Sequence, residues 1–287
     1  MPTAREDDQL GRVCLVTGAT SGIGKEIARG LALKRAHVVV AARDAERGRR
    51  VAEELSNDTA NPSVESVELD VASQASVRRF AADFTKRFTN LHVLVNCAGV
   101  YAGTKQKTAD GIERTWATNV LGYFLPTVLL LDTLVASAPA RIVNVASAVA
   151  DGLELADVEL DRRPYRGMVA YKQSKQADRM LTWCFAERLR GKGVTANAMH
   201  PGFVRTSLVR DGAFAFLFAL GGLFARSPVR GAETAVWLAT SRAMTDDTGG
   251  FYVDKKERHC RFRDEEAQRR LWALCERMTG RAAPSEG

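Results

Sequence analysis

A tyrosine and a lysine four residues apart, Tyr171 and Lys175, stand in a strongly patterned helical segment. Residues at this spacing lie on one face of a helix, so the phenol and the ammonium are neighbours. A free tyrosine titrates near ~10, and a neighbouring ammonium favours its phenolate form, which suits proton transfer. Because such pairs are also common on solvated helices, this pair predicts catalysis only when other features support it.

A glycine-rich loop with the sequence TGATSGIG follows the first apolar run of the chain, at Thr17 to Gly24. Such a loop, placed between a strand and a helix, lets backbone N–H groups approach a pyrophosphate, and the helix dipole adds positive potential there. Gly18 would make the tight turn, while Gly22 and Gly24 would remove side chains that block the approach or the packing of helix on strand. This context predicts binding of a dinucleotide.

The end of the second predicted strand bears on which dinucleotide binds. An NAD site places a carboxylate there to accept hydrogen bonds from the ribose 2′-hydroxyl, and that carboxylate would repel a 2′-phosphate. This chain instead has Arg43, with Asp44 next and Arg47 a helical turn further on. A guanidinium suits a phosphate, so we expect NADP(H) rather than NAD(H). The alternative is that Arg43 is an ordinary surface residue.

Strand-like and helix-like segments alternate almost from end to end. The predicted strands are 12–17, 37–41, 64–69, 91–96, 141–146, 194–199 and 250–253, and the predicted helices are 23–35, 45–55, 76–88, 111–135, 169–190, 230–240 and 265–278. Strands that are apolar throughout need cover on both faces. We therefore expect an α/β protein with a single-domain Rossmann fold, a doubly wound parallel sheet of about seven strands with helices on both faces.

Composition indicates an ordinary soluble globular protein, with 46% apolar and 26% charged residues. The net charge of +7 is spread over helices that also carry acids, although it is denser from Lys255 to Arg281. We interpret it as a solvated surface around a site for a polyanionic cofactor, not as a nucleic-acid interface. The five cysteines have no metal-binding spacing, and no signal peptide or membrane-spanning segment is evident, so we expect a cytoplasmic protein without a metal.

From about residue 12 to residue 253 the chain resembles the short-chain dehydrogenase/reductase family. The motifs that carry the resemblance are the TGATSGIG loop, Asp70-Val71, Asn96-Cys97-Ala98-Gly99, Asn119, Ser147, the Tyr171/Lys175 pair and His200-Pro201-Gly202. So many motifs in order, at suitable separations, make chance agreement very improbable.

The resemblance implies roles for four residues. Tyr171 would donate its proton to a carbonyl oxygen during reduction, or take the hydroxyl proton in oxidation. Lys175 would hydrogen-bond the nicotinamide ribose and favour the phenolate of Tyr171. Ser147 would hold the substrate oxygen, and Asn119 would anchor a water that relays protons from Lys175 to solvent.

The resemblance also implies the cofactor contacts. Asp70 and Val71 would lie at the adenine, Asn96, Ala98 and Gly99 at the adenosine ribose, and Pro201, Gly202, Val204 and Thr206 at the nicotinamide end. The remaining predicted cofactor residues are Gly18, Thr20, Ser21, Gly22, Ile23, Gly24 and Arg43, together with Tyr171 and Lys175.

Two departures from the family pattern concern the site. Cys97 replaces an asparagine, which loses an amide, and Ala146 replaces a second serine before Ser147. The long segment between Ser147 and Tyr171 resembles the branch of retinol dehydrogenases, which also holds members similar to protochlorophyllide reductase and to the WW-domain oxidoreductases.

The segment 204–228 falls where such enzymes carry a substrate lid, and it is rich in phenylalanine. We expect Phe203, Phe214, Phe216 and Leu217 to contact a bulky apolar substrate. Core packing, a subunit contact and loose membrane association are the alternatives.

The expected function is an NADP(H)-dependent ketone or aldehyde reductase, or the reverse alcohol dehydrogenase, acting on a bulky apolar or aromatic molecule. The alternatives are a C=C reductase similar to protochlorophyllide reductase and a non-catalytic NADP-binding sensor or scaffold. Residues 12–99 would form the cofactor-binding half, 100–203 the catalytic half, 204–228 the lid and 255–287 a C-terminal extension with a helix. A homodimer or homotetramer is possible on this interpretation.

Overall fold

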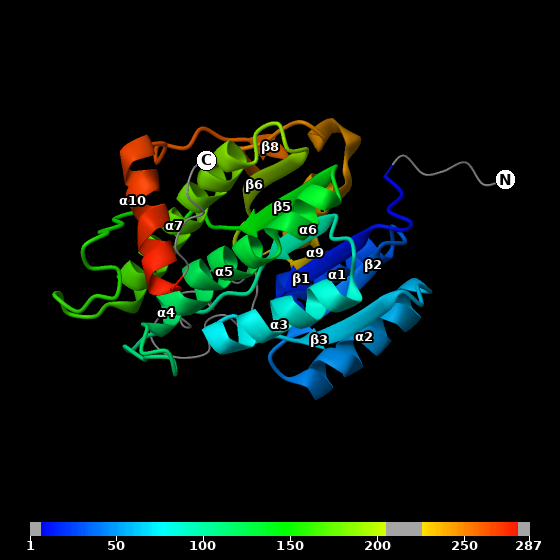
Figure 1. The fold of residues 1–287 in the computed structure, drawn as a ribbon, viewed down its shortest axis with the longest axis horizontal. Coiled ribbons are helices and arrows are strands. Elements are labelled where there is room, and N and C mark those ends of the chain that lie inside the picture. The colour runs from blue at the N-terminus through cyan, green and yellow to red at the C-terminus, as the bar shows by residue number, and fades with distance from the viewer. Residues whose placement is uncertain (1–6, 205–225, 281–287) are drawn as a thin grey trace.

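A computed structural model describes residues 7–204 and 226–280. The chain forms one eight-stranded sheet with the order β3-β2-β1-β4-β5-β6-β7-β8 (Figure 1). The strands are β1 (Val13–Thr17), β2 (His37–Ala42), β3 (Val64–Glu68), β4 (Val93–Asn96), β5 (Ala140–Val145), β6 (Val194–His200), β7 (Phe251–Val253) and β8 (Lys256–Glu257). The first seven pair in parallel and β8 pairs antiparallel with β7. The predicted α/β fold is confirmed, with one short edge strand more than the seven expected.

Helices cover both faces of the sheet, because alternate residues of a strand point to opposite sides. On β1, Cys14 and Val16 pack into one core and Leu15 into the other. The first core is covered by α1 (Gly22–Ala32), α2 (Ala45–Thr59) and α9 (Pro228–Thr240), and the second by α3 (Gln74–Arg87), α5 (Gly122–Leu129) and α7 (Gly167–Arg188). The strand order reverses between β1 and β4, which is where open α/β sheets bind ligands.

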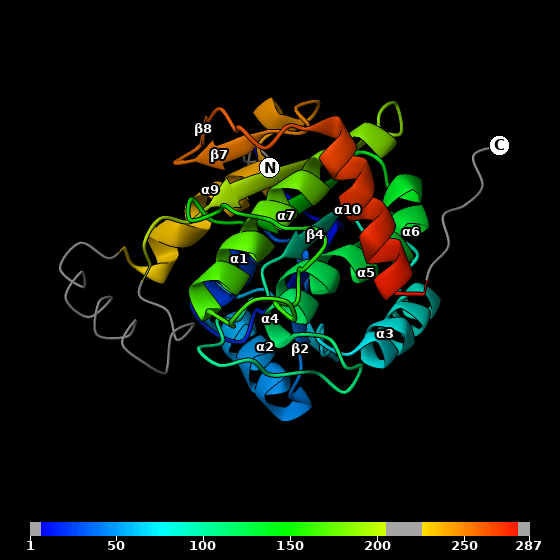
Figure 2. The same cartoon turned by 90° about the vertical axis from the view of Figure 1, so that its left-hand side faces the viewer.

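A further helix, α10 (Glu265–Met278), packs outside the second layer, against α7 and α5 (Figures 1 and 2). It contributes Leu271, Trp272 and Cys275, and the Trp272 ring lies edge-on to Phe124 and Phe185, with centroids 4.9 and 5.1 Å apart. The predicted helix 265–278 has these same bounds.

The prediction of a single long helix over 111–135 is wrong. The chain there forms α4 (Arg114–Trp116), a π-helical turn η1 (Ala117–Leu121), α5 and α6 (Leu131–Ala136). A π-turn inserts one residue into the helical ladder, and α5 and α6 meet at Leu130, which lies outside the helical region at φ −98° and ψ 7°. Hydrophobic periodicity indicates which face of a helix is apolar, but it does not detect local changes in the backbone hydrogen-bonding pattern of the helix. None of the helices in the described ranges is both long and apolar enough to cross a membrane.

Candidate active site

The glycine loop joins β1 to α1 at the carboxyl edge of the sheet. Gly18 has φ +66°, and a Cβ there would lie 2.6 Å from the Cα of Ala98. A Cβ on Gly24 would lie 2.3 Å from the Gly18 carbonyl oxygen. A side chain at either position would therefore collide with backbone atoms, as the glycine motif in the sequence indicates.

The start of α1 has the features of an anion site. Ser21 is its N-cap residue and makes no side-chain capping bond, so the first N–H groups of the helix stay available to a ligand. The side chains of Thr20, Ser21 and Ile23 are half-buried around it. Thr17 Oγ1 accepts hydrogen bonds from the amides of Cys97 (3.0 Å) and Ala98 (3.2 Å), which holds the loop after β4 beside the glycine loop. This cradle fits the pyrophosphate of a dinucleotide.

At the end of β2, Arg43 is exposed and forms no hydrogen bond or ion pair with another described residue. Asp44 is engaged as the N-cap of α2, where Oδ1 accepts from the Arg47 amide at 2.9 Å. The Arg47 guanidinium donates to the carbonyl of Thr20 at 3.3 Å. The Arg47 guanidinium thus lies at the glycine loop, Arg43 lies at the end of β2, and the carboxylate of Asp44 caps a helix.

The predicted adenosine contacts lie along the next two strand ends. Asp70 and Val71 follow β3 and are half-buried, and Asp70 Oδ1 accepts from the Ala72 amide at 3.0 Å. Ala98 and Gly99 are half-buried after β4. The Asn96 side chain, in contrast, is fully buried and donates to Thr127 Oγ1 and Asn144 Oδ1, at 3.0 and 2.9 Å, so any cofactor contact at this position has to come from its backbone.

The predicted catalytic residues gather where β5, α7 and η1 meet. Lys175 is 4% exposed, and its Nζ donates to the carbonyl of Val145 at 3.0 Å, two residues before Ser147. Ser147 is buried, and its Oγ accepts from the Val149 amide at 3.0 Å. Tyr171 is half-buried one turn before Lys175, with its ring edge-on to Tyr101.

Asn119 lies inside η1 and is fully buried. Its Oδ1 accepts from the Val100 amide at 2.8 Å, and its Nδ2 donates to the Val100 carbonyl at 3.1 Å and to Ser174 Oγ at 2.9 Å. The side chain therefore ties the loop after β4 to α7 at the residue beside Lys175. Its predicted part in a water relay stays a prediction.

Two residues of α7 that the sequence reasoning missed, Asp178 and Arg179, contact this cluster. Asp178 is fully buried and its Oδ2 accepts from Lys175 Nζ at 2.8 Å. Arg179 donates to the carbonyl of Ser147, and its guanidinium stacks 3.7 Å from the centroid of the Phe251 ring. The available signal was the i, i+3 spacing of Lys175 and Asp178 on a strongly predicted helix.

The electrostatics of the cluster favour a charged lysine. Burial disfavours the ammonium, but the negative charge of Asp178 and the proximity of Tyr171 together raise the pKa of Lys175. Burial raises the pKa of Asp178 to about 6, against the opposing effect of Lys175. Burial likewise raises the pKa of Cys97 to about 12, so this thiol is neutral at physiological pH.

The chain after β6 continues the site. Pro201 and Gly202 are half-buried, and Gly202 has φ +82°, where a Cβ would lie 2.8 Å from the Arg226 side chain. Phe203 is 59% exposed, whereas Val204 is buried and bridges to Arg226. The predicted contacts Thr206, Phe214, Phe216 and Leu217 lie outside the described residues.

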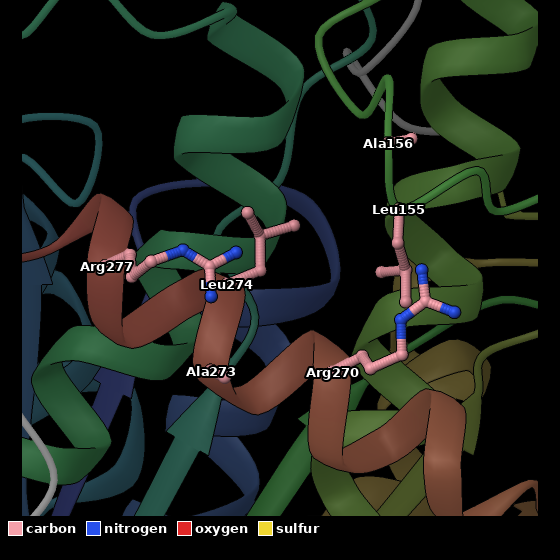
Figure 3. Close-up of a pocket in the computed structure, with 6 residues that line it drawn as sticks. All are labelled: Leu155, Ala156, Arg270, Ala273, Leu274 and Arg277. Carbon is pink, nitrogen blue, oxygen red and sulfur yellow. The ribbon is translucent and has the colours of Figure 1, made fainter.

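A pocket of 340 Å³ lies elsewhere, between α10 and the segment that precedes α7 (Figure 3). Its lining residues are Leu155, Ala156, Arg270, Ala273, Leu274 and Arg277. None of the predicted site residues contributes to it. Within the described ranges, no cluster of three or more His, Cys, Asp or Glu side chains could hold a metal ion.

Comparisons with known proteins show similarity over most of the chain. A family model described as short chain dehydrogenase matches residues 12–213. Human retinol dehydrogenase 13 is 38% identical over 96% of this chain and 86% of its own length, and human retinol dehydrogenase 12 is 40% identical over 93% of this chain and 86% of its own. Mouse polyprenol dehydrogenase is 40% identical over 95% of this chain and 85% of its own length. An uncharacterised Mycobacterium Paratuberculosis protein has a similar structure, with a TM-score of 0.78 at 30% identity over 98% of both chains. The NADP complex of Pseudomonas aeruginosa RhlG gives 0.69 at 29% identity, over 86% of this chain and 95% of its own.

Proposed function

The chain belongs to the short-chain dehydrogenase family and is an oxidoreductase of CH–OH and C=O groups, and on that premise we propose that it is an NADP(H)-dependent reductase of bulky apolar ketones or aldehydes. The reverse alcohol oxidation uses the same groups. The observation that carries the proposal is the buried, charged Lys175 one helical turn from Tyr171 and bonded to the strand end that precedes Ser147.

The protein's own part in the reaction is to position the substrate and handle one proton. Reduced nicotinamide supplies the hydride when the cofactor is bound. Ser147 holds the carbonyl oxygen by a hydrogen bond, and Tyr171 donates its hydroxyl proton to that oxygen as negative charge develops. The Lys175 ammonium stabilises the phenolate that Tyr171 leaves behind.

The preference for NADP(H) rests on the end of β2. Arg43 has no acidic partner among the described residues, and Arg47 reaches the glycine loop through Thr20. A 2′-phosphate placed there would gain charge-assisted hydrogen bonds. Asp44, which could otherwise accept from a ribose hydroxyl, caps α2.

The substrate class follows from the relatives and from the surface after β6. The relatives are named for retinol and polyprenol, both long apolar alcohols. Phe203 offers an exposed aromatic ring next to Gly202. We infer a substrate with a large apolar body attached to the reacting carbon.

The test is turnover by the purified protein with NADPH or NADH and a panel of retinal, a polyprenal, aromatic ketones and small polar ketones, followed by absorbance of the reduced nicotinamide. We expect kcat/KM to favour NADPH by at least about tenfold, as one lost charge-assisted contact implies, and the apolar carbonyls over the polar ones. Equal use of both cofactors would contradict the role of Arg43. No turnover of any carbonyl would contradict the proposed reaction.

A further inference from the structure

Asp178 and Lys175 form an ion pair in the interior of the protein. Asp178 is 0% and Lys175 4% exposed, and the Oδ2–Nζ distance is 2.8 Å. Lys175 Nζ also donates to the Val145 carbonyl at 3.0 Å and lies 5.1 Å from the centroid of the Tyr123 ring. The ammonium is thus fixed from two sides, by a carboxylate on its own helix and by the end of β5.

Stability gives little reason to keep this carboxylate. Taking two charges out of water costs about as much as their attraction returns, so a buried ion pair is often replaceable by apolar residues without loss. Asp178 is also incompletely satisfied, because its Oδ1 is buried with no hydrogen-bond partner among the described residues. An orphaned carboxylate oxygen adds a further cost. A role in the reaction accounts for its presence better than a role in folding.

Among the described residues, the other titratable groups around the pair include no second carboxylate. They are Tyr171 and Arg179 of α7, Cys97 after β4, Tyr123 of α5 and Cys275 of α10. Burial raises the pKa of both Cys275 and Tyr123 above their ordinary values and the pKa of Cys97 to about 12. Asp178 is therefore the single described carboxylate in contact with Lys175.

We propose that Asp178 is a positioning residue for catalysis, which keeps Lys175 protonated and in place beside Tyr171 while both are buried. The proposal rests on the proposed function, since it assigns a task to the lysine of the proton-transfer pair. Without the carboxylate, desolvation would act unopposed and the ammonium would give up its proton at lower pH. The reaction would then lose the charge that stabilises the Tyr171 phenolate.

The test compares Asp178→Asn, which keeps the shape and removes the charge, with the unmodified protein. For carbonyl reduction by NADPH we expect the alkaline limb of the kcat profile to move down by about one pH unit or more. At pH values above the displaced limb kcat falls about tenfold or more relative to the unmodified protein, and KM for the carbonyl changes by less than about twofold. Asp178→Glu, which restores the charge on a longer arm, keeps the alkaline limb of the unmodified protein with a kcat a few-fold lower.

The matched control is Asp157→Asn. Asp157 is also a buried acid in an ion pair, with Arg163 at 2.9 Å, but lies in the segment before α7 and touches none of the catalytic residues. We expect Asp157→Asn to leave the pH profile of kcat unchanged. An unchanged alkaline limb in a folded Asp178→Asn protein overturns the proposal. If Asp178→Asn does not fold, Asp178→Glu decides, and an alkaline limb displaced to lower pH in that variant, although it keeps the charge, overturns the proposal.

A second measurement needs no turnover. In Asp178→Asn the pKa of the lone buried ammonium falls below its value in the unfolded chain, so the folded state binds fewer protons and gains stability as pH rises. The deficit in Tm relative to the unmodified protein therefore shrinks between about pH 7 and 10. A constant deficit contradicts the proposal. Absence of turnover in the unmodified protein contradicts only the proposed function and leaves this measurement to decide on Asp178.

Discussion

Lys175 is almost completely buried and yet its pKa is raised, whereas burial by itself lowers the pKa of a lysine. Sequence reasoning predicted the pair of Tyr171 and Lys175 because both belong to one recognisable pattern. It missed Asp178, although the spacing was visible, because an acid three residues after a lysine is common on solvated helix faces. Only the packing of α7 against β5 and α5 shows that this acid is enclosed.

Arg43→Ala tests the cofactor preference at the residue that carries it. Removing the guanidinium removes the contact with the 2′-phosphate, so we expect kcat/KM with NADPH to fall about 10- to 100-fold and with NADH to change less than about threefold. The control is Arg49→Ala, another exposed arginine on α2, whose partner is the exposed Glu53. An equal fall in kcat/KM with both cofactors would mean that Arg43 does not bind the 2′-phosphate.

At the scale of elements, the strands and most helices were predictable from hydrophobic periodicity and from the glycine loop. The region 111–135 was not, because its apolar residues continue through η1 and Pro126 without a break in pattern. The π-turn has a structural consequence, since it contains Asn119, the residue that ties Val100 to Ser174. The segments that would contact the adenosine were predictable from sequence. That the Asn96 side chain is buried was visible only in the structure.

Gly24→Ala tests whether the close approach of β1, the glycine loop and α1 is essential. The added Cβ would lie 2.3 Å from a backbone oxygen, so the loop has to move. We expect NADPH affinity to fall at least about tenfold and the free energy of unfolding to drop by about 1–3 kcal/mol. Gly103→Ala is the control, because nothing lies within 4 Å of its Cβ position. Unchanged NADPH binding by Gly24→Ala, measured by titration, would refute this account of the loop.

At the scale of the whole molecule, the sequence predicted α10 as a helix but not what it covers. Its apolar residues belong to one cluster with Phe124 of α5 and Phe185 of α7. Helix–helix packing of this kind depends on distant segments meeting, which local periodicity does not encode. A dimer or tetramer stays a prediction.

Trp272→Ala tests the contribution of this helix to stability. Removing a buried tryptophan leaves a cavity against Phe124 and Phe185, so we expect the free energy of unfolding in urea to fall by about 3–5 kcal/mol. Leu33→Ala, at a leucine that is 56% exposed, should cost less than about 0.5 kcal/mol. A loss below about 1 kcal/mol for Trp272→Ala would show that α10 is not part of the cooperative core.

The most direct test of the proton-transfer account is a comparison of Tyr171→Phe with the unmodified protein in NADPH-dependent carbonyl reduction. The variant keeps the ring beside Tyr101 and loses only the hydroxyl. We predict a fall in kcat of about 10²- to 10⁴-fold, the usual contribution of a positioned general acid, in a variant that still binds NADPH. Turnover by Tyr171→Phe within about twofold of the unmodified protein would contradict the assignment of Tyr171 as the proton donor.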